Sequence, residues 1–195
     1  MDVASDIGVF LIRSVLMLFL MLVMIRVLLQ VARADFYNPI SQAIVKITNP
    51  LLLPLRRIVP GFAGIDMAGI VLALLIQFVA IIALFSLNGF GFPPIANMVA
   101  WAGLGLIALI LDIYWVTVLV GIVASFVAAH NPHPALLLLR QFTEPVLAPF
   151  RKILPDMGGL DLSPILFFLS LGVCEILLIN GAKAVGVPGS LVLGF

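Results

Sequence analysis

Apolar residues run along this chain in four long stretches, at about residues 8–31, 67–88, 98–128 and 163–185. Each stretch has few charged residues and is long enough for an α-helix to cross a bilayer, which takes roughly 20 residues. The third stretch would extend roughly 46 Å as a helix, so it must tilt or project beyond the hydrocarbon. The pattern predicts an all-α membrane protein with four transmembrane helices.

A different pattern occupies the amphipathic segments 39–60 and 134–155, which lie between the first and second spans and between the third and fourth. Apolar residues recur there on one helical face, which is typical of a helix lying at a membrane surface. Pro54 and Pro149 each remove a backbone donor, so we expect short or kinked helices, preceded by separate short helices at 39–48 and 134–143. The residues of the two stripes are Leu51, Leu52, Leu55, Ile58 and Val59, and Val146, Leu147, Phe150, Ile153 and Leu154.

The two amphipathic segments are copies of one another. Residues 46–70 and 141–165 align without a gap at an offset of 95, with ten identities in 25 positions. A repeat of this kind predicts two units, 1–95 and 96–195, each with the order span, amphipathic segment, span. An even number of spans per unit makes the repeats parallel, so both insert the same way up about a pseudo-two-fold axis along the membrane normal.

The basic residues indicate the orientation. Segments 32–66 and 129–162 contain several lysines and arginines, whereas the connection 89–97 contains none. The positive-inside rule therefore predicts that both basic loops are cytoplasmic and that both termini are outside. Only 10% of residues are charged and 64% are hydrophobic, which excludes a soluble domain.

The repeated charges allow two interpretations. The basic residues could anchor to lipid phosphates while the aspartates cap the following helices, with Ser163 as a further cap before Pro164. Alternatively, the pairs Arg56/Asp66 and Arg151/Asp161 could form a symmetric polar platform that recognises a partner. The candidate interaction residues are Arg56, Arg57, Asp66, Arg151, Lys152 and Asp161.

Four charged residues, Arg13, Arg26, Asp112 and Glu175, lie within the predicted spans. Charges in a bilayer are costly and are usually paired or functional. The predicted depths favour an Arg13–Glu175 pair, whereas Arg26 could reach either lipid headgroups or Asp112. None of these charges recurs in the other repeat, so structural pairing is favoured over a symmetric ion path.

Candidate chemistry is otherwise sparse. The single cysteine, Cys174, cannot form an intramolecular disulfide, and the chain has no nucleophile elbow, phosphate-binding glycine loop or helical histidine pair. His130 and His133 flank Pro132, which is more typical of a turn than of a metal site. We therefore expect neither an enzyme nor a cofactor, metal or nucleic-acid site.

Several motifs of the second repeat resemble the signature of the YggT family of bacterial and plastid membrane proteins. They are Thr143-Glu144-Pro145, Pro149-Phe150-Arg151-Lys152, Pro155, Gly158-Gly159-Leu160-Asp161 and Leu162-Ser163-Pro164. The first repeat departs from this signature at Ala68-Gly69, where the second has Ser163-Pro164. The resemblance implies a bacterial inner-membrane protein of the two-repeat form, without catalytic residues.

Family members are linked to osmotic-stress tolerance with a suggested effect on potassium uptake, to division-site or nucleoid organisation, and in plastids to assembly of a b-type cytochrome. The favoured hypothesis is a non-enzymatic protein that assists assembly or organisation of membrane components and supports osmotic-stress tolerance. The alternative is an accessory to a channel or transporter for potassium uptake. The expected partners are the bilayer with its anionic headgroups, other membrane proteins, or a second copy of the chain.

Overall fold

The computed structural model describes residues 3–62, 64–127, 133–154 and 161–195. The α-helices in these residues are α1 (Val3–Val31), α2 (Pro39–Arg56), α3 (Met67–Leu87), α4 (Ile95–Val127), α5 (Pro134–Ile153) and α6 (Ser163–Ala184). Four of them, α1, α3, α4 and α6, are long and apolar enough to cross a membrane. The prediction of an all-α membrane protein with four spans is confirmed.

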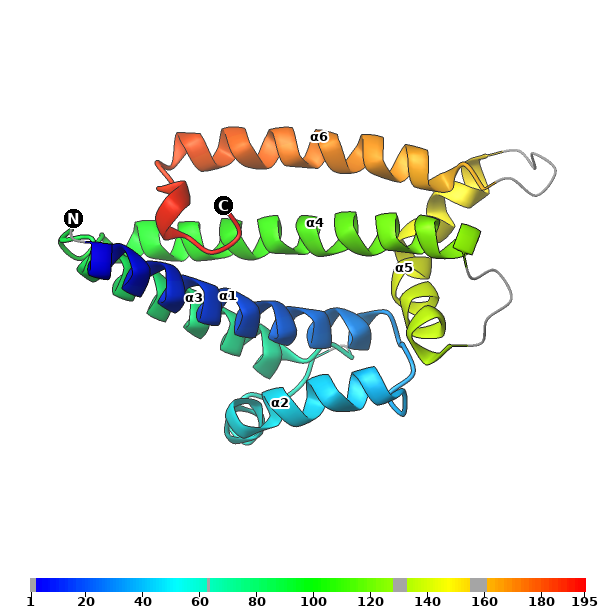
Figure 1. Ribbon diagram of the computed structural model, residues 1–195, viewed down its shortest axis with the longest axis horizontal. Helices are drawn as coiled ribbons and strands as arrows, with labels where there is room; N and C mark the ends of the chain where they lie inside the picture. The colour runs from blue at the N-terminus through cyan, green and yellow to red at the C-terminus, as the bar shows by residue number, and fades with distance from the viewer. Residues whose placement is uncertain (1–2, 63, 128–132, 155–160) are drawn as a thin grey trace.

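The two repeats have the same arrangement. In Figure 1, α1 and α4 run in one direction along the long axis of the molecule, and α3 and α6 return in the other. Helix α2 packs against α1 and α3, α5 packs in the same way against α4 and α6, and α3 meets α4 where the halves join. These are the parallel repeats that the sequence predicts.

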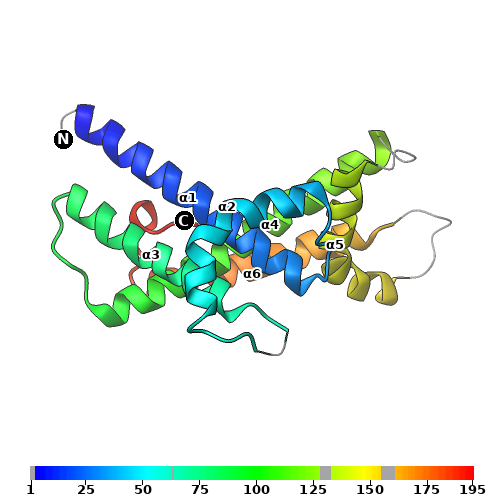
Figure 2. The same ribbon diagram turned by 90° about the horizontal axis from the view of Figure 1, so that it is seen from below.

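Each amphipathic segment forms a single helix, so the prediction of separate short helices upstream is wrong. The expected kink is present in α2, which bends along its length (Figures 1 and 2). Asn38 begins α2 by accepting the Ile40 N–H on Oδ1 at 3.0 Å, and His133 begins α5 by accepting the Ala135 N–H on Nδ1 at 3.2 Å. Both helices run through two internal prolines, which are Pro50 and Pro54 in α2 and Pro145 and Pro149 in α5. A proline removes only one donor per turn. Packing of each helix against two spans can compensate for that loss.

The predicted apolar stripes are only partly buried. Leu52 and Leu147 are buried, but Ile58 and Ile153 are more than 70% exposed. The buried residues of each helix begin upstream of the predicted stripe, and they run from residue 41 to residue 52 in α2 and from 138 to 147 in α5. The exposed apolar residues are therefore available to lipid or to a partner.

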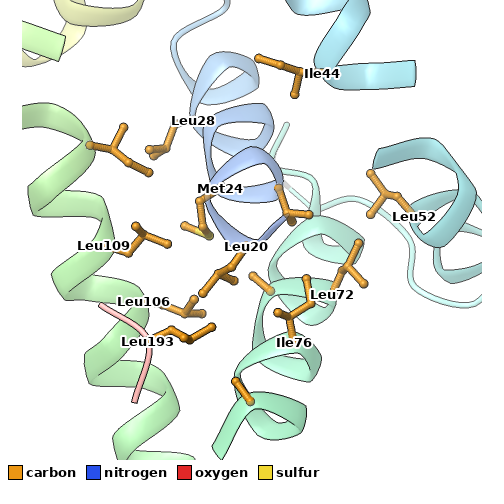
Figure 3. Packing of buried hydrophobic residues seen from close by; sticks show 14 of the residues in the cluster. Leu20, Met24, Leu28, Ile44, Leu52, Leu72, Ile76, Leu106, Leu109 and Leu193 are labelled. Atoms are coloured by element: carbon orange, nitrogen blue, oxygen red, sulfur yellow. The ribbon is translucent and has the colours of Figure 1, made fainter. Parts of the chain in front are cut away.

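The core lies among α1, α3 and α4, where Leu20 and Met24 of α1 point between Ile76 of α3 and Leu109 of α4 (Figure 3). Lipid is as apolar as leucine, so close packing must hold these helices together. Gly69 permits the approach of α1, since a Cβ there would lie 2.5 Å from Val27 Cγ2. The small-residue spacing of Gly69 and Ala73, both buried, marks a real helix contact.

An irregular C-terminal segment after α6, residues 185–195, turns back into the bundle, which the sequence did not predict (Figure 1). It contains the 3₁₀ turn Gly189–Leu191, and the apolar side chains of Val192 and Leu193 are fully buried. Gly105 of α4 leaves room for it, because a Cβ there would lie 2.6 Å from Leu193 O. Non-helical backbone is tolerated at membrane depth only where protein surrounds it.

Candidate functional site: the polar pockets of the two repeats

An ion pair joins α2 to α3 in the first repeat. Arg56 Nη2 donates to Asp66 Oδ2 at 2.5 Å, with the Asp66 side chain 5% exposed and that of Arg56 40% exposed. Asp66 occupies the N-cap position of α3, but its carboxylate makes no capping hydrogen bond. The expectation that Asp66 caps the helix with its side chain is therefore wrong.

The corresponding arginine of the second repeat has two acidic partners. Arg151 Nε donates to Asp161 Oδ2 at 2.8 Å, and Arg151 Nη1 donates to Glu144 Oε2 at 2.6 Å. The Asp161 Oδ1 atom also accepts the backbone N–H of Ser163 at 2.9 Å. Ser163 is the first residue of α6 and not its N-cap, and its Oγ atom is buried without a partner among the described residues.

These contacts shift two pKa values outside the spans. Burial alone would lower the pKa of Arg151, but its hydrogen bonds and ion pairs with Glu144 and Asp161 outweigh burial and raise it. Burial alone would raise the pKa of the Asp161 carboxyl, but contacts with Ser163 and Arg151 hold it below its usual range. The second repeat therefore keeps both ends of its pair charged.

Arg26 of α1 is buried and reaches α2. Its Nη1 atom donates to Thr48 Oγ1 at 2.5 Å and to Asn49 Oδ1 at 3.0 Å, and both of these side chains are neutral. The structure therefore places Arg26 neither with Asp112 nor in an ion pair with any other described residue. Position 26 corresponds to Gly121 in the second repeat, and Asn49 corresponds to Glu144.

Each repeat has a cavity beside its amphipathic helix. The first, of about 400 Å³, is lined by Arg26, Arg33 and Arg56, with no acidic residue in its wall. The second, of about 550 Å³, is lined by two arginines and two carboxylates, namely Arg140, Arg151, Glu144 and Asp161. Gly121 and Ser125 of α4 also line the second cavity.

The prediction that Arg13 pairs with Glu175 is wrong. The Arg13 guanidinium donates to Ser190 O and, at 2.6 Å, to Phe195 O in the C-terminal segment. Gln77 also binds this segment, since its Nε2 atom donates to Leu193 O at 2.7 Å. These contacts cannot be predicted from a side-chain pattern, because Arg13 and Gln77 bind backbone oxygens of the segment.

Glu175 of α6 and Asp112 of α4 are both exposed. Neither carboxylate forms an ion pair with a described residue. Arg57 and Lys152 are exposed beside the two bound arginines. His130 lies outside the described residues, and within the described ones no group of three or more potential metal ligands is found.

The fold and the paired pockets define a multi-pass helical membrane protein built from two tandem repeats. The chain belongs to the CCB3/YggT family, whose model matches it twice, at residues 5–87 and 100–182. The chain is 44% identical to a Pseudomonas aeruginosa protein over 94% of each chain. It is also 36% identical to the YggT protein of Escherichia coli K12, over 88% of this chain and 92% of that protein. No solved structure was found to match.

Proposed function

We propose that this protein is a non-enzymatic organiser of the bacterial inner membrane that binds other membrane proteins and supports tolerance of osmotic stress. The observation that carries the proposal is the position of Glu175. This residue is roughly 18 Å from the start of α6 and roughly 14 Å from its end, at about 1.5 Å per residue. Its side chain is exposed, as are those of its sequence neighbours Val173, Ile176 and Leu177.

A carboxylate facing the middle of the hydrocarbon is strongly disfavoured and normally has a partner. The protein itself supplies no ion-pair partner for Glu175 among the described residues. A polar or basic residue on a helix of another subunit would satisfy it. The exposed face of α6 is therefore our proposed contact with a partner membrane protein or a second copy of the chain.

The amphipathic helices support the same proposal at the membrane surface. Helices α2 and α5 meet near their first turns (Figure 2), where Asn38 Nδ2 donates to Pro134 O at 2.7 Å. Gln141 Oε1 of α5 also accepts the Asp35 N–H at 2.8 Å. This joins the basic segments of both repeats into one surface, which we propose is cytoplasmic, with both termini outside. Reporter fusions at Phe195 and before α2 test that orientation, and a cytoplasmic signal at Phe195 would overturn it.

The alternative, an accessory to potassium transport, receives less support. A transport path needs polar groups that are continuous across the bundle. Two of the polar side chains between the spans, Arg13 and Gln77, are instead bound to the backbone of the C-terminal segment. The two large polar cavities lie beside α2 and α5.

The exposed thiol of Cys174, next to Glu175, allows a direct test. A benzophenone maleimide attached to Cys174 in native membranes should crosslink to a defined partner or to a second copy on illumination. Glu175→Gln should weaken that crosslink and reduce growth of a deletion strain complemented with it at high osmolarity. The matched control carries the probe at Val79→Cys on the exposed face of α3, in a Cys174→Ser background. No defined adduct from Cys174, or the same adducts from both positions, would contradict the proposal.

A further inference from the structure

The 400 Å³ cavity of the first repeat is an unbalanced basic site. Arg26, Arg33 and Arg56 line it with no acidic residue in its wall, and Asp66, which does not line it, binds Arg56 Nη2. Of these three arginines, only Arg56 forms an ion pair among the described residues. Guanidinium groups in such a cluster are well suited to phosphate, whose oxygens match their planar donor geometry.

Arg26 is the buried donor of this site. It is 93% buried, and its Nη1 atom is held by Thr48 and Asn49. Its Nε and Nη2 atoms have no acceptor among the described residues. They are also not among the fully enclosed unpartnered atoms, which are Gln77 Oε1 and Ser163 Oγ. Because Arg26 lines the cavity, we infer that these remaining donors are available to a ligand there.

Arg33 is held in an unfavourable backbone conformation at the mouth of the cavity. Its φ is +53°, and it ends α1 in a Schellman motif in which the Ala34 N–H donates to Leu29 O at 3.0 Å. Glycine normally occupies this position, because other residues are strained there. The chain thus places an arginine at the cavity where glycine would stabilise the fold more.

An apolar cavity of about 220 Å³ adjoins the basic one. Leu29 and Ile44 line both, and Leu138 and Phe142 of α5 complete the apolar wall. A basic pocket beside an apolar groove suits an amphiphile with a phosphate at one end. The second repeat lacks this chemistry, because the wall of its cavity contains two carboxylates, Glu144 and Asp161, which both bind Arg151.

The geometry points to a binding site for a phosphate group in the first repeat, formed by Arg26, Arg33 and Arg56. The adjoining apolar groove favours the headgroup of an anionic phospholipid over a soluble phosphate compound. This inference is independent of the proposed contact at α6, which lies in the other repeat.

Isothermal titration of the full-length protein in a neutral detergent tests the site with three probes. These are dioctanoyl phosphatidylglycerol, inorganic phosphate, and dioctanoylglycerol, which has the same chains without phosphate. We expect saturable binding of the phospholipid and none of dioctanoylglycerol. Arg26→Gln should weaken phospholipid binding at least tenfold. The control Arg57→Gln removes an adjacent exposed arginine that does not line the cavity, and should change it less than twofold.

The relative affinities of two probes identify the source of the phosphate. Phospholipid binding at least tenfold tighter than that of inorganic phosphate assigns the site to a lipid headgroup. Equal affinity, with both lost in Arg26→Gln, assigns it to a soluble phosphate ligand. No saturable binding of either probe overturns the inference, as does equal weakening by Arg57→Gln and Arg26→Gln.

A second variant protects the test against misfolding of Arg26→Gln. Arg33→Gly should raise the thermal unfolding temperature, since glycine relieves the positive φ, while weakening phospholipid binding at least threefold. A residue with a purely structural role would not move stability and binding in opposite directions. Unchanged binding in a more stable Arg33→Gly protein would overturn the assignment of Arg33.

Discussion

The two repeats share a fold and an arginine–aspartate pair, but they differ in how the charge around that pair is balanced. In the first repeat Asp66 is almost fully buried, and Arg26 adds a second cation bound by neutral groups. In the second repeat a glycine replaces Arg26, and Glu144 gives Arg151 a second carboxylate. The pair itself serves the same structural purpose in both, since it joins the amphipathic helix to the span that follows.

The two repeats therefore share the ion pair that joins the amphipathic helix to the following span, and they differ in the charge of the cavity beside it. The second pocket is neutral within the protein, with two cations and two anions in its wall. The first has uncompensated arginines and needs an external anion to balance them. Four substitutions or conditions probe this contrast, beginning with the largest expected effect.

Removing the arginine of each pair should separate the repeats most clearly. Arg56→Ala leaves the buried Asp66 carboxylate without its partner, which should lower the free energy of unfolding by about 2–3 kcal/mol, somewhat less than for a fully buried pair. Arg151→Ala leaves two exposed carboxylates and should cost less than about 1 kcal/mol, although Arg151 has more partners. Unfolding by steric trapping in bicelles measures both, and a larger loss in Arg151→Ala would contradict the comparison.

The C-terminal segment distinguishes the halves in a second way, because it packs on α1 and α3 of the first repeat and on Gly105 of α4. Gly105→Ala would place a Cβ 2.6 Å from both Gln77 Nε2 and Leu193 O, and should cost about 1–3 kcal/mol through overpacking. Gly103→Ala on the same helix meets no atom within 4 Å and is the control. Similar stabilities for the two variants would show that the segment does not pack in this way.

Arg13→Gln should release the same C-terminal segment without disturbing α6. We expect increased protease cleavage within the segment that follows Val185. The free energy of unfolding should fall by about 1–2 kcal/mol, as for the loss of a hydrogen bond from a charged donor. Glu175→Gln should leave cleavage unchanged, because Arg13 does not bind Glu175. Equal sensitivity in both variants would restore the intramembrane pair that the sequence predicts.

The smallest effect concerns pH. Because the folded pKa of Asp161 is lowered, its ionisation stabilises the fold above the unfolded pKa of about 3.9, and this stabilisation is lost as pH falls through the folded value. Wild type should exceed Asp161→Asn by less than about 1 kcal/mol at pH 6, since the pair is largely exposed. The gap should close as pH falls below about 3.9 and through the lowered folded pKa. A gap that persists in acid would exclude ionisation of Asp161 as its cause.

The sequence was sufficient for the spans and the repeat, and one of its two interpretations grouped Arg56 with Asp66 and Arg151 with Asp161, which form ion pairs. Apolar runs and repeated spacings are local signals, so they survive in the fold. The predicted pairing of Arg13 with Glu175 is wrong, because a similar depth in the membrane does not determine which groups meet. Its actual acceptors are backbone oxygens, which no side-chain pattern reveals.

The basic cavity of the first repeat also could not be predicted from the sequence. Arg26 is recognisable as a charge within a span, but its partners Thr48 and Asn49 lie on α2, and the sequence does not show how α2 packs against α1. The contrast between Arg26 and Gly121 is present in the repeat alignment and could have signalled a one-sided site. The alignment alone does not show that Arg33 and Arg56 line the same cavity.

The most direct test of this contrast exchanges the chemistry of the two pockets and counts bound phospholipid by native mass spectrometry. The first-half variant combines Arg26→Gly with Asn49→Glu, and the second-half variant combines Gly121→Arg with Glu144→Asn. The wild type should bind one dioctanoyl phosphatidylglycerol, the first-half variant none, and the second-half variant two. One bound phospholipid in all three proteins would contradict the claim that the first repeat alone has an open phosphate site.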